Sequence, residues 1–282
     1  MVAQTVLETP KSFWAEIDGQ RTHYLKTGAG PPLFLVHGLL GGSFCWRFNV
    51  AELSKRHTVY ALDLPGQGLS DVKRGTNCGM QKQAERLACF IQKEALDSVD
   101  VAASSWGGAV ALLLAASCSA VRSLVLAAPV NPWSAFGRER VRFCGSTVGS
   151  MLVRCGLPFS ARFHHIAVER MYGDISRIQP GTIEGYSELI RRRGRARNLI
   201  NIFRNWEHDL AALEEAIPCV EAPTLLVWGT RDGAVDLRSA EPLKRSLRHC
   251  RVQMLPGVGH LPFEESPEVF NRLVLDFIQH PE

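Results

Sequence analysis

Short apolar runs alternate with helix-like segments along most of this chain, and that alternation limits its fold more than any other feature. The apolar runs have the length of buried strands, and each ends near Gly, Pro, Asp or Ser; they are residues 33–36, 59–62, 99–103, 124–126, 225–227 and 252–255. Helical periodicity fills the intervals at residues 43–54, 80–96, 106–117, 237–247 and 267–278. This order predicts a mostly parallel sheet with helices on both faces.

The start of the chain has a different pattern. Residues 13–17 and 22–26 have strand-like composition and flank the turn pair Asp18-Gly19. They predict an antiparallel hairpin at the edge of the sheet, which brings the sheet to eight strands.

The alternation stops once, between residues 131 and 217. No strand pattern occurs there, only amphipathic helix-like pieces such as Arg138 to Leu152 and Ile183 to Phe203. We therefore expect an α/β core made of residues 1–130 and 218–282, with residues 131–217 inserted as a helical cap.

Composition and charge narrow the partners. The 282 residues are 46% hydrophobic and 21% charged, with a net charge of only +4, which favours a globular protein that binds a small-molecule substrate and not nucleic acid. Residues 1–12 lack the apolar segment of a secretory signal, and no later run is long enough to cross a bilayer. We expect a cytoplasmic protein without stable membrane insertion. Its eight cysteines have no metal-binding spacing and are expected to be buried, reduced thiols.

The chemistry concentrates where the apolar run 99–103 meets the helix-like run after it. A nucleophile on so tight a strand-to-helix turn needs small residues two positions before and after it. With Ser105 at the centre these are Ala103 and Gly107, whereas Ser104 would place Trp106 at one of the positions. Ser105 is therefore the predicted nucleophile. The structural alternative is a serine that only caps the following helix.

A serine hydroxyl needs a base to take its proton, and that base needs a carboxylate to orient it. His260 lies in a glycine-flanked loop just beyond the last predicted strand and is the predicted base. Asp232 follows the buried run 225–227 and is the predicted acid. Asp236 is an alternative, although a helix N-cap is its simpler role, and Asp232 could itself be only a turn former.

Two backbone N–H groups are the expected donors to the oxyanion formed during attack on a carbonyl. One belongs to Trp106, directly after the nucleophile, and the other to Leu39 in the glycine-rich loop that follows residues 33–36. His37 precedes this loop and is expected to brace it.

Together these segments resemble the α/β-hydrolase superfamily, in its cap-bearing branch of small esterases, C–C bond hydrolases and cofactor-free haloperoxidase-like enzymes. Five ordered motifs carry the resemblance: His37-Gly38, the Asp63-to-Ser70 turn, Ser105-Trp106-Gly107-Gly108, Gly229 to Asp232, and Gly259-His260. Two positions depart from the family pattern, since Ala103 and Gln67 stand where glycine and histidine are common. The resemblance implies a triad of Ser105, Asp232 and His260, and a structural role for Asp63.

The resemblance also limits the reaction. Relatives that open epoxides or displace halide use aspartate at the nucleophile position, so serine implies acyl transfer instead. The expected function is hydrolysis of small to medium apolar carboxylic esters, without cofactor or metal. The alternatives are a C–C hydrolase of ring-cleavage products and a non-catalytic ligand receptor on the same fold. The expected substrate-binding residues are Leu40, Trp133, Phe136 and Leu261.

One dense basic cluster runs from Arg191 to Arg197. A solvated helix face is the simpler interpretation, and an anion or membrane contact is the alternative.

Overall fold

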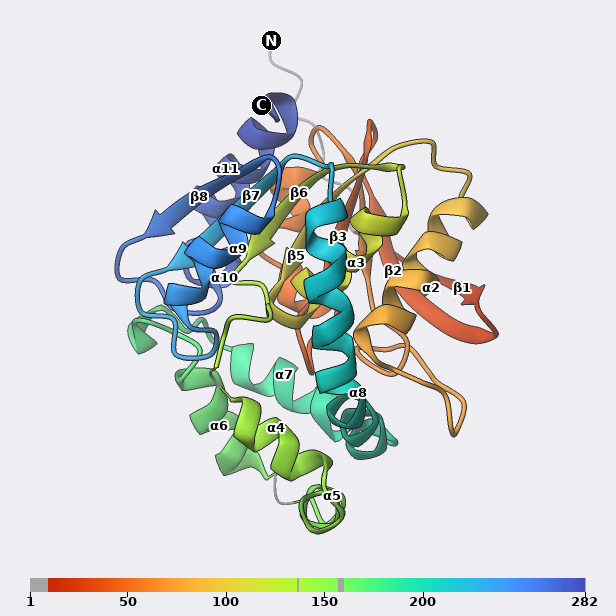
Figure 1. Cartoon of the computed structure of the whole chain (residues 1–282), viewed down its shortest axis with the longest axis vertical. Coiled ribbons are helices and arrows are strands. Elements are labelled where there is room, and N and C mark those ends of the chain that lie inside the picture. The colour runs from red at the N-terminus through yellow and green to blue at the C-terminus, as the bar shows by residue number, and fades with distance from the viewer. Residues whose placement is uncertain (1–9, 136, 157–159, 282) are drawn as a thin grey trace.

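An eight-stranded sheet forms the centre of the computed structural model, which describes residues 10–135, 137–156 and 160–281 (Figure 1). The strands are β1 (Lys11–Ile17), β2 (Gln20–Thr27), β3 (Pro32–Val36), β4 (Thr58–Leu62), β5 (Val99–Ser104), β6 (Val121–Ala127), β7 (Thr224–Gly229) and β8 (Cys250–Leu255). They lie in the order β1-β2-β4-β3-β5-β6-β7-β8, and every pairing from β4 to β8 is parallel. The predicted mostly parallel sheet is confirmed.

Helices cover both faces of the sheet, as the alternation of side chains along β3 shows. Phe34 and Val36 enter a core cluster with α2 (Met80–Lys93) and α3 (Ser105–Ser117). Leu33 and Leu35 enter a second cluster with α1 (Val50–Leu53) and α11 (Pro267–Gln279). Because the strands β3 to β7 are buried on both faces, their sequences are nearly continuous apolar runs and not alternating ones.

Smaller elements complete the core: the helices α9 (Ala240–Ser246) and α10 (Pro262–Glu265), and the 3-10 turns η1 (Ser43–Trp46), η4 (Ile217–Cys219) and η5 (Leu237–Ser239). The predicted helix at residues 43–54 is wrong as a single element, since it divides into η1 and α1.

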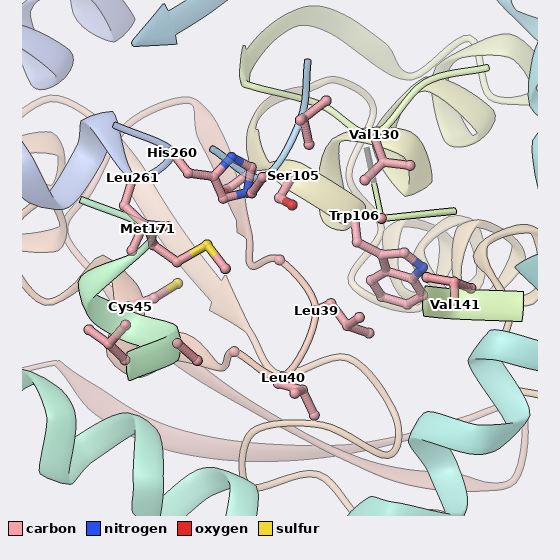
Figure 2. Close-up of a pocket in the computed structure, with 18 of the residues that line it drawn as sticks. Leu39, Leu40, Cys45, Ser105, Trp106, Val130, Val141, Met171, His260 and Leu261 are labelled. Carbon is pink, nitrogen blue, oxygen red and sulfur yellow. The ribbon is translucent and has the colours of Figure 1, made fainter. Parts of the chain in front are cut away.

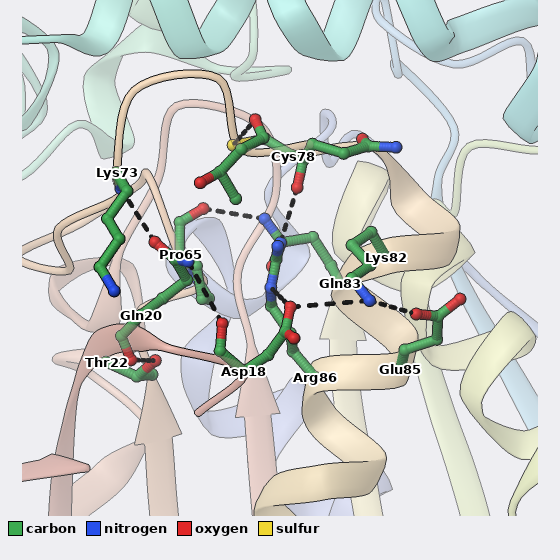
Figure 3. A network of polar contacts seen from close by, with 12 residues as sticks. Asp18, Gln20, Thr22, Pro65, Lys73, Cys78, Lys82, Gln83, Glu85 and Arg86 are labelled. Carbon is green, nitrogen blue, oxygen red and sulfur yellow. Dashed lines mark hydrogen bonds and ion pairs between the residues drawn. The ribbon is translucent and has the colours of Figure 1, made fainter. Parts of the chain in front are cut away.

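The predicted edge hairpin is confirmed. β1 and β2 are antiparallel, and Asp18 and Gly19 both have positive φ, at 50° and 68°, as a tight hairpin turn requires. The side chain of Arg86 on α2 donates to Asp18 Oδ2 at 3.1 Å and to the Asn77 carbonyl at 2.8 Å (Figure 3). In the same network, Lys73 N–H donates to Gln20 Oε1 at 2.9 Å. These bonds fix the hairpin and the loop before α2 to the same helix.

Between β6 and β7 the described residues form helices and no strand. They are α4 (Arg138–Gly145), α5 (Thr147–Arg154), α6 (Ala161–Glu169), η3 (Ile175–Arg177), α7 (Thr182–Arg191) and α8 (Arg195–Ala216). Figure 1 shows α4, α5, α6 and α7 grouped on one side of the sheet, with α8 running from that group back to α3. The C-terminal half of α8 places Trp206, Leu210 and Leu213 in the α2–α3 core cluster.

Two of the predicted cap helices are wrong in extent. The piece 138–152 breaks at Ser146, whose side chain accepts the Gly149 N–H and caps α5. The piece 183–203 breaks before α8 at Gly194, which has a φ of 88° that non-glycine residues rarely adopt.

The cysteines differ in part from the expectation. All eight are free, but Cys89, Cys155 and Cys219 are exposed instead of buried. Within the described ranges, no helix is both long and apolar enough to cross a membrane.

Candidate active site

Ser105 lies on a strained turn between β5 and α3. Its φ is +53°, in the left-handed region that costs a non-glycine residue about 1–2 kcal/mol. The backbone at His37 passes very close to Gly107. A Cβ added to Gly107 would lie 2.2 Å from the His37 carbonyl oxygen. Gly38 also faces the Ser105 side chain, since its added Cβ would lie 3.1 Å from Ser105 Cβ. The small residue at 107 is thus required by the approach of the 37–38 backbone.

His260 and Asp232 are brought together from the two loops that follow β8 and β7. His260 Nδ1 lies 2.9 Å from Asp232 Oδ2, and both side chains are almost wholly buried. The other carboxylate oxygen of Asp232 accepts the N–H groups of Ala234 at 2.8 Å and Val235 at 3.0 Å. Asp232 therefore has a fixed orientation. Asp236 instead caps η5 by accepting the Arg238 N–H, which is the N-cap role predicted as its simpler function.

Ser105 and His260 line the same cavity, and Figure 2 shows both side chains pointing into it. No hydrogen bond joins the two side chains in the part of the chain that the structure describes. Catalytic hydrogen bonds are often long in the free enzyme and tighten only when substrate binds. The two side chains therefore share one cavity without being hydrogen-bonded to each other in this structure.

Hydrogen bonds to Leu64 and Gln67 hold the loop of residues 37–42 in place. The Leu40 N–H is used elsewhere, since it donates to Gln67 Oε1 at 2.7 Å. His37 is fully buried, with Nδ1 2.7 Å from the Gly38 carbonyl and Nε2 accepting the Leu64 N–H at 3.0 Å. Burial lowers the pKa of His37, which keeps the ring neutral and able to accept at Nε2. These contacts confirm that His37 braces the loop.

Leu39 and Trp106 both line the cavity. The Trp106 N–H lies in the first turn of α3, where backbone amides have no intrahelical acceptor. The Trp106 amide therefore has no acceptor within its own helix.

The cavity has a volume of about 320 Å³ and is mainly apolar. Its apolar lining comes from the core loops and from the helices between β6 and β7: Leu39, Leu40, Val130, Val141, Phe163, Val168, Met171, Ile190, Leu210, Val235, Leu261 and Phe263. The polar lining groups beyond the triad include Asn131, Arg138, His164 and Tyr186. A site of this size and polarity fits a small or medium apolar ligand with few polar groups.

The predicted substrate-binding residues have different outcomes. Leu40 and Leu261 line the cavity. Trp133 lies outside the lining and packs against the α2–α3 core cluster. Phe136 lies outside the described residues. The basic cluster 191–197 does not reach the cavity.

Two buried carboxylates just after His260 hold the His260 loop against the helices between β6 and β7. Glu265 accepts the N–H of Gly259 at 2.7 Å and of Gly173 at 3.0 Å on one oxygen. Its other oxygen accepts the Asp174 N–H at 3.1 Å and Arg177 Nη1 at 3.4 Å. The His260 N–H donates to the Met171 carbonyl at 2.6 Å. The position of His260 thus depends on residues 171–177.

The neighbouring Glu264 binds a second set of partners. It accepts Arg47 Nη2 and the Tyr172 hydroxyl, each at 2.9 Å, and also the Tyr186 hydroxyl. Its carboxylate therefore joins η1 to α7 behind the cavity. Neither glutamate was predicted as a site residue, and the only signal in the sequence is a pair of adjacent acids shortly after His260.

A hydrogen-bonded series of Ser, His and Asp occurs elsewhere, at the sheet edge. Ser12 Oγ lies 2.7 Å from His23 Nε2, and His23 Nδ1 lies 2.8 Å from Asp63 Oδ2. Ser12 is exposed and does not line the cavity, while Asp63 also accepts the Leu69 N–H at 2.7 Å. These contacts support the structural role predicted for Asp63 and provide an internal comparison for the site at Ser105.

Comparison with known proteins places the chain in a family. Residues 33–273 match the model of the alpha/beta hydrolase family. The chain belongs to this family. Its relatives include epoxide hydrolase 1 of Caenorhabditis elegans, 24% identical over 299 residues, which cover 97% of this chain and 71% of the relative.

The similarity extends to other α/β hydrolases. The 2-hydroxy-6-oxo-2,4-heptadienoate hydrolase of Pseudomonas putida is 27% identical over 266 residues, covering 92% of this chain and 93% of the relative. A solved membrane phospholipase A superposes with a TM-score of 0.80 and 26% identity, covering 96% of this chain and 86% of that one. Family membership supports a hydrolase, and these relatives differ in the bond that their names specify.

Proposed function

We propose that this α/β hydrolase cleaves carboxylic esters of small to medium apolar substrates through an acyl-enzyme on Ser105. The observation that carries the proposal is the His260–Asp232 pair at 2.9 Å, with His260 and Ser105 on one apolar cavity. The serine also argues against the alkyl-ester route by which aspartate nucleophiles open epoxides. The phospholipase relative is named for cleaving esters, which supports the same class of bond.

In this mechanism, Ser105 Oγ attacks the ester carbonyl carbon while His260 Nε2 takes the hydroxyl proton. Asp232 holds His260 through Nδ1 and stabilises the imidazolium that forms. The N–H groups of Leu39 and Trp106 donate to the oxyanion. The tetrahedral intermediate collapses, and His260 gives its proton to the departing alcohol. A water molecule that loses a proton to His260 then attacks the acyl carbon and releases the acid and Ser105.

We also propose that residues 131–217 act as a cap over a core of residues 1–130 and 218–282. Support comes from the cavity lining, since Val141, Phe163, Val168 and Met171 face the substrate space from this segment. Selectivity for the acyl or alcohol part would then depend on these side chains.

One observation favours C–C bond hydrolysis of a carboxylated dienoate as a second candidate. Arg138 lines the cavity, and its Nη2 donates to the Pro132 carbonyl at 2.6 Å. Its Nε is buried and has no hydrogen-bond partner among the described residues. An unpaired guanidinium donor in an apolar cavity suits a substrate carboxylate. The relative from Pseudomonas putida is named for a substrate of this kind.

The test is a chain-length series of nitrophenyl esters assayed beside a ring-cleavage dienoate. The proposal expects ester turnover in the wild type and loss of it in Ser105→Ala. Arg138→Gln is the discriminating variant, because it should leave neutral-ester turnover within a few fold and reduce turnover only of a carboxylated substrate. Turnover of the dienoate but not of any ester would favour the second candidate. No turnover of either would favour a non-catalytic receptor.

A further inference from the structure

Four arginines from separate segments line a second cavity, here named the arginine cavity, with a volume of about 240 Å³. They are Arg74, Arg154, Arg197 and Arg204. Arg74 lies in the loop between β4 and α2, and Arg154 is the last residue of α5. The other two lie seven residues apart on α8 and therefore on one face of that helix. The arginine cavity shares no lining residue with the cavity at Ser105.

The arginine cavity holds positive charge without a matching acid. Its remaining described lining residues are Gly75, Thr76, Asn198, Ile200 and Asn201. Arg204 donates to the Gly145 carbonyl at 3.3 Å and to Ser150 Oγ at 3.4 Å, both neutral groups. Among the described residues, none of the four arginines has a carboxylate within ion-pair distance. Other exposed arginines are paired, for example Arg245 with Glu241 and Arg248 with Glu221.

The segments that carry these arginines are fixed by hydrogen bonds. Asn201 Oδ1 accepts the Cys78 N–H at 2.7 Å, which ties the loop of Arg74 to α8. The same loop is held at Lys73 by Gln20 and at Asn77 by Arg86 (Figure 3). The backbone that carries Arg74 is therefore fixed relative to α8.

A neighbouring cavity of about 270 Å³ extends the positive surface. It shares Arg197 and Asn198 with the arginine cavity and adds Arg192, Arg193 and Arg195. Arg195 is buried and donates to the carbonyl oxygens of Gly68 and Leu189. Burial first, and then the charge of Arg192, lower the pKa of Arg195 to about 10. Asp71 also lines this neighbouring cavity and, with Asp63, partly offsets the charge there, so in the described part of the chain the arginines of these two cavities without an acidic partner are those of the arginine cavity.

We propose that the arginine cavity binds a phosphate group carried by a ligand or lipid. Guanidinium groups match phosphate through paired, charge-assisted N–H···O bonds, and several of them suit a dianion better than a singly charged carboxylate. The Thr76 hydroxyl and the Asn201 side-chain amide add neutral donors at the same cavity. The volume accommodates a phosphate group but not a lipid tail.

The phosphate group could be free in solution or could belong to a lipid headgroup, and α5 gives a reason to test both sources. Arg154 ends this helix, and three apolar side chains on it are exposed: Val148 at 65%, Met151 at 68% and Leu152 at 42%. Exposed apolar residues beside a basic site are typical of helices that rest on anionic membranes.

In the experiment, the full chain is titrated with inorganic phosphate, and chloride at equal ionic strength is the reference. Calorimetry measures the heat of binding. The test variant is the double substitution Arg154→Gln with Arg204→Gln. The matched control is Arg245→Gln with Arg248→Gln, which removes the same charge from exposed arginines elsewhere on the surface. We expect saturable phosphate binding to the wild type and the control, at least tenfold weaker in the test variant. Circular dichroism verifies that each variant is folded.

Two results would overturn the proposal: no saturable phosphate binding by the wild type, or equal weakening in the test and control variants. Sedimentation with phosphatidylcholine vesicles, with and without phosphatidic acid, then identifies the source. Binding only to vesicles with phosphatidic acid, and its competition by phosphate, assigns a lipid headgroup. Phosphate binding without sedimentation assigns a free phosphorylated ligand.

Discussion

Replacement of Glu265 by glutamine tests whether this buried carboxylate positions the catalytic histidine. Glutamine keeps one carbonyl oxygen but puts an NH₂ group where the second oxygen now accepts two N–H groups, those of Gly259 and Gly173. A hydrogen bond to a charged group contributes about 1.5–3 kcal/mol, so loss of two such bonds should cost about 3 kcal/mol of unfolding free energy. Because domains are stable by about 5–15 kcal/mol, the variant should still fold.

The same substitution should reduce activity, because Gly259 precedes His260 directly. A displacement of about 1 Å at a catalytic group can cost about a hundredfold in rate, so we expect kcat/KM for a nitrophenyl ester to fall between tenfold and a hundredfold. The decrease should appear in kcat more than in KM, since the substrate cavity itself keeps its lining.

The assays are urea unfolding and steady-state ester hydrolysis, with Glu268→Gln as the control. Glu268 is an exposed carboxylate three residues along the chain, and its substitution should change stability by less than about 0.5 kcal/mol. The reasoning would be refuted by a Glu265→Gln protein with the same unfolding midpoint and the same kcat as Glu268→Gln.

Three further predictions follow from the site and the core. Asp232→Asn should lower kcat for the same ester about 10⁴-fold with little change in KM, because asparagine favours the wrong tautomer of His260. A loss of less than about tenfold would contradict the proposed triad. Gly107→Ala should lower the free energy of unfolding in urea by about 1–3 kcal/mol, because the alanine Cβ would lie 2.2 Å from the His37 carbonyl oxygen. An unchanged unfolding midpoint would contradict this close approach. Burial lowers the pKa of both His37 and His57, so below their ordinary pKa the unfolded chain binds more protons than the folded chain. The free energy of unfolding should therefore be level above about pH 6.5 and fall below it. A flat profile down to about pH 5 would contradict that reasoning.

The strands of the sheet could be predicted from sequence because each carries its own local signal, whereas their order in the sheet was not predicted. A buried strand must be apolar on both faces, and a tight hairpin turn must adopt positive φ, so both features appear in short stretches such as residues 33–36 and Asp18-Gly19. The meeting of Asp232 with His260 could also be anticipated, since loops after neighbouring parallel strands emerge at one edge of the sheet.

The packing of the helices between β6 and β7 could not be predicted in the same way. Amphipathic periodicity identifies helices, but it does not say which apolar side chains face the cavity and which pack on the core. Trp133 packs on the core, while Val141 and Met171 line the cavity. Helix boundaries also depended on Gly194, whose positive φ becomes evident only with the backbone in place.

Long-range polar contacts formed the second gap. Glu265 joins residues more than eighty positions apart in the chain, and the four arginines of the arginine cavity come from three separate segments. No local pattern encodes such a meeting. The cluster at residues 191–197 also divides, since Arg195 is buried against the Gly68 carbonyl while Arg192 and Arg197 are exposed.

The nucleophile itself is tested most directly by reaction with a fluorophosphonate, followed by intact mass and peptide mapping. A single adduct on Ser105 is expected in the wild type, and none in Ser105→Ala. Ser12 serves as the internal control, because it is hydrogen-bonded to a His–Asp pair but lies outside the cavity and should stay unmodified. An unmodified wild type, or an adduct that persists on another serine in Ser105→Ala, would contradict the assignment of Ser105.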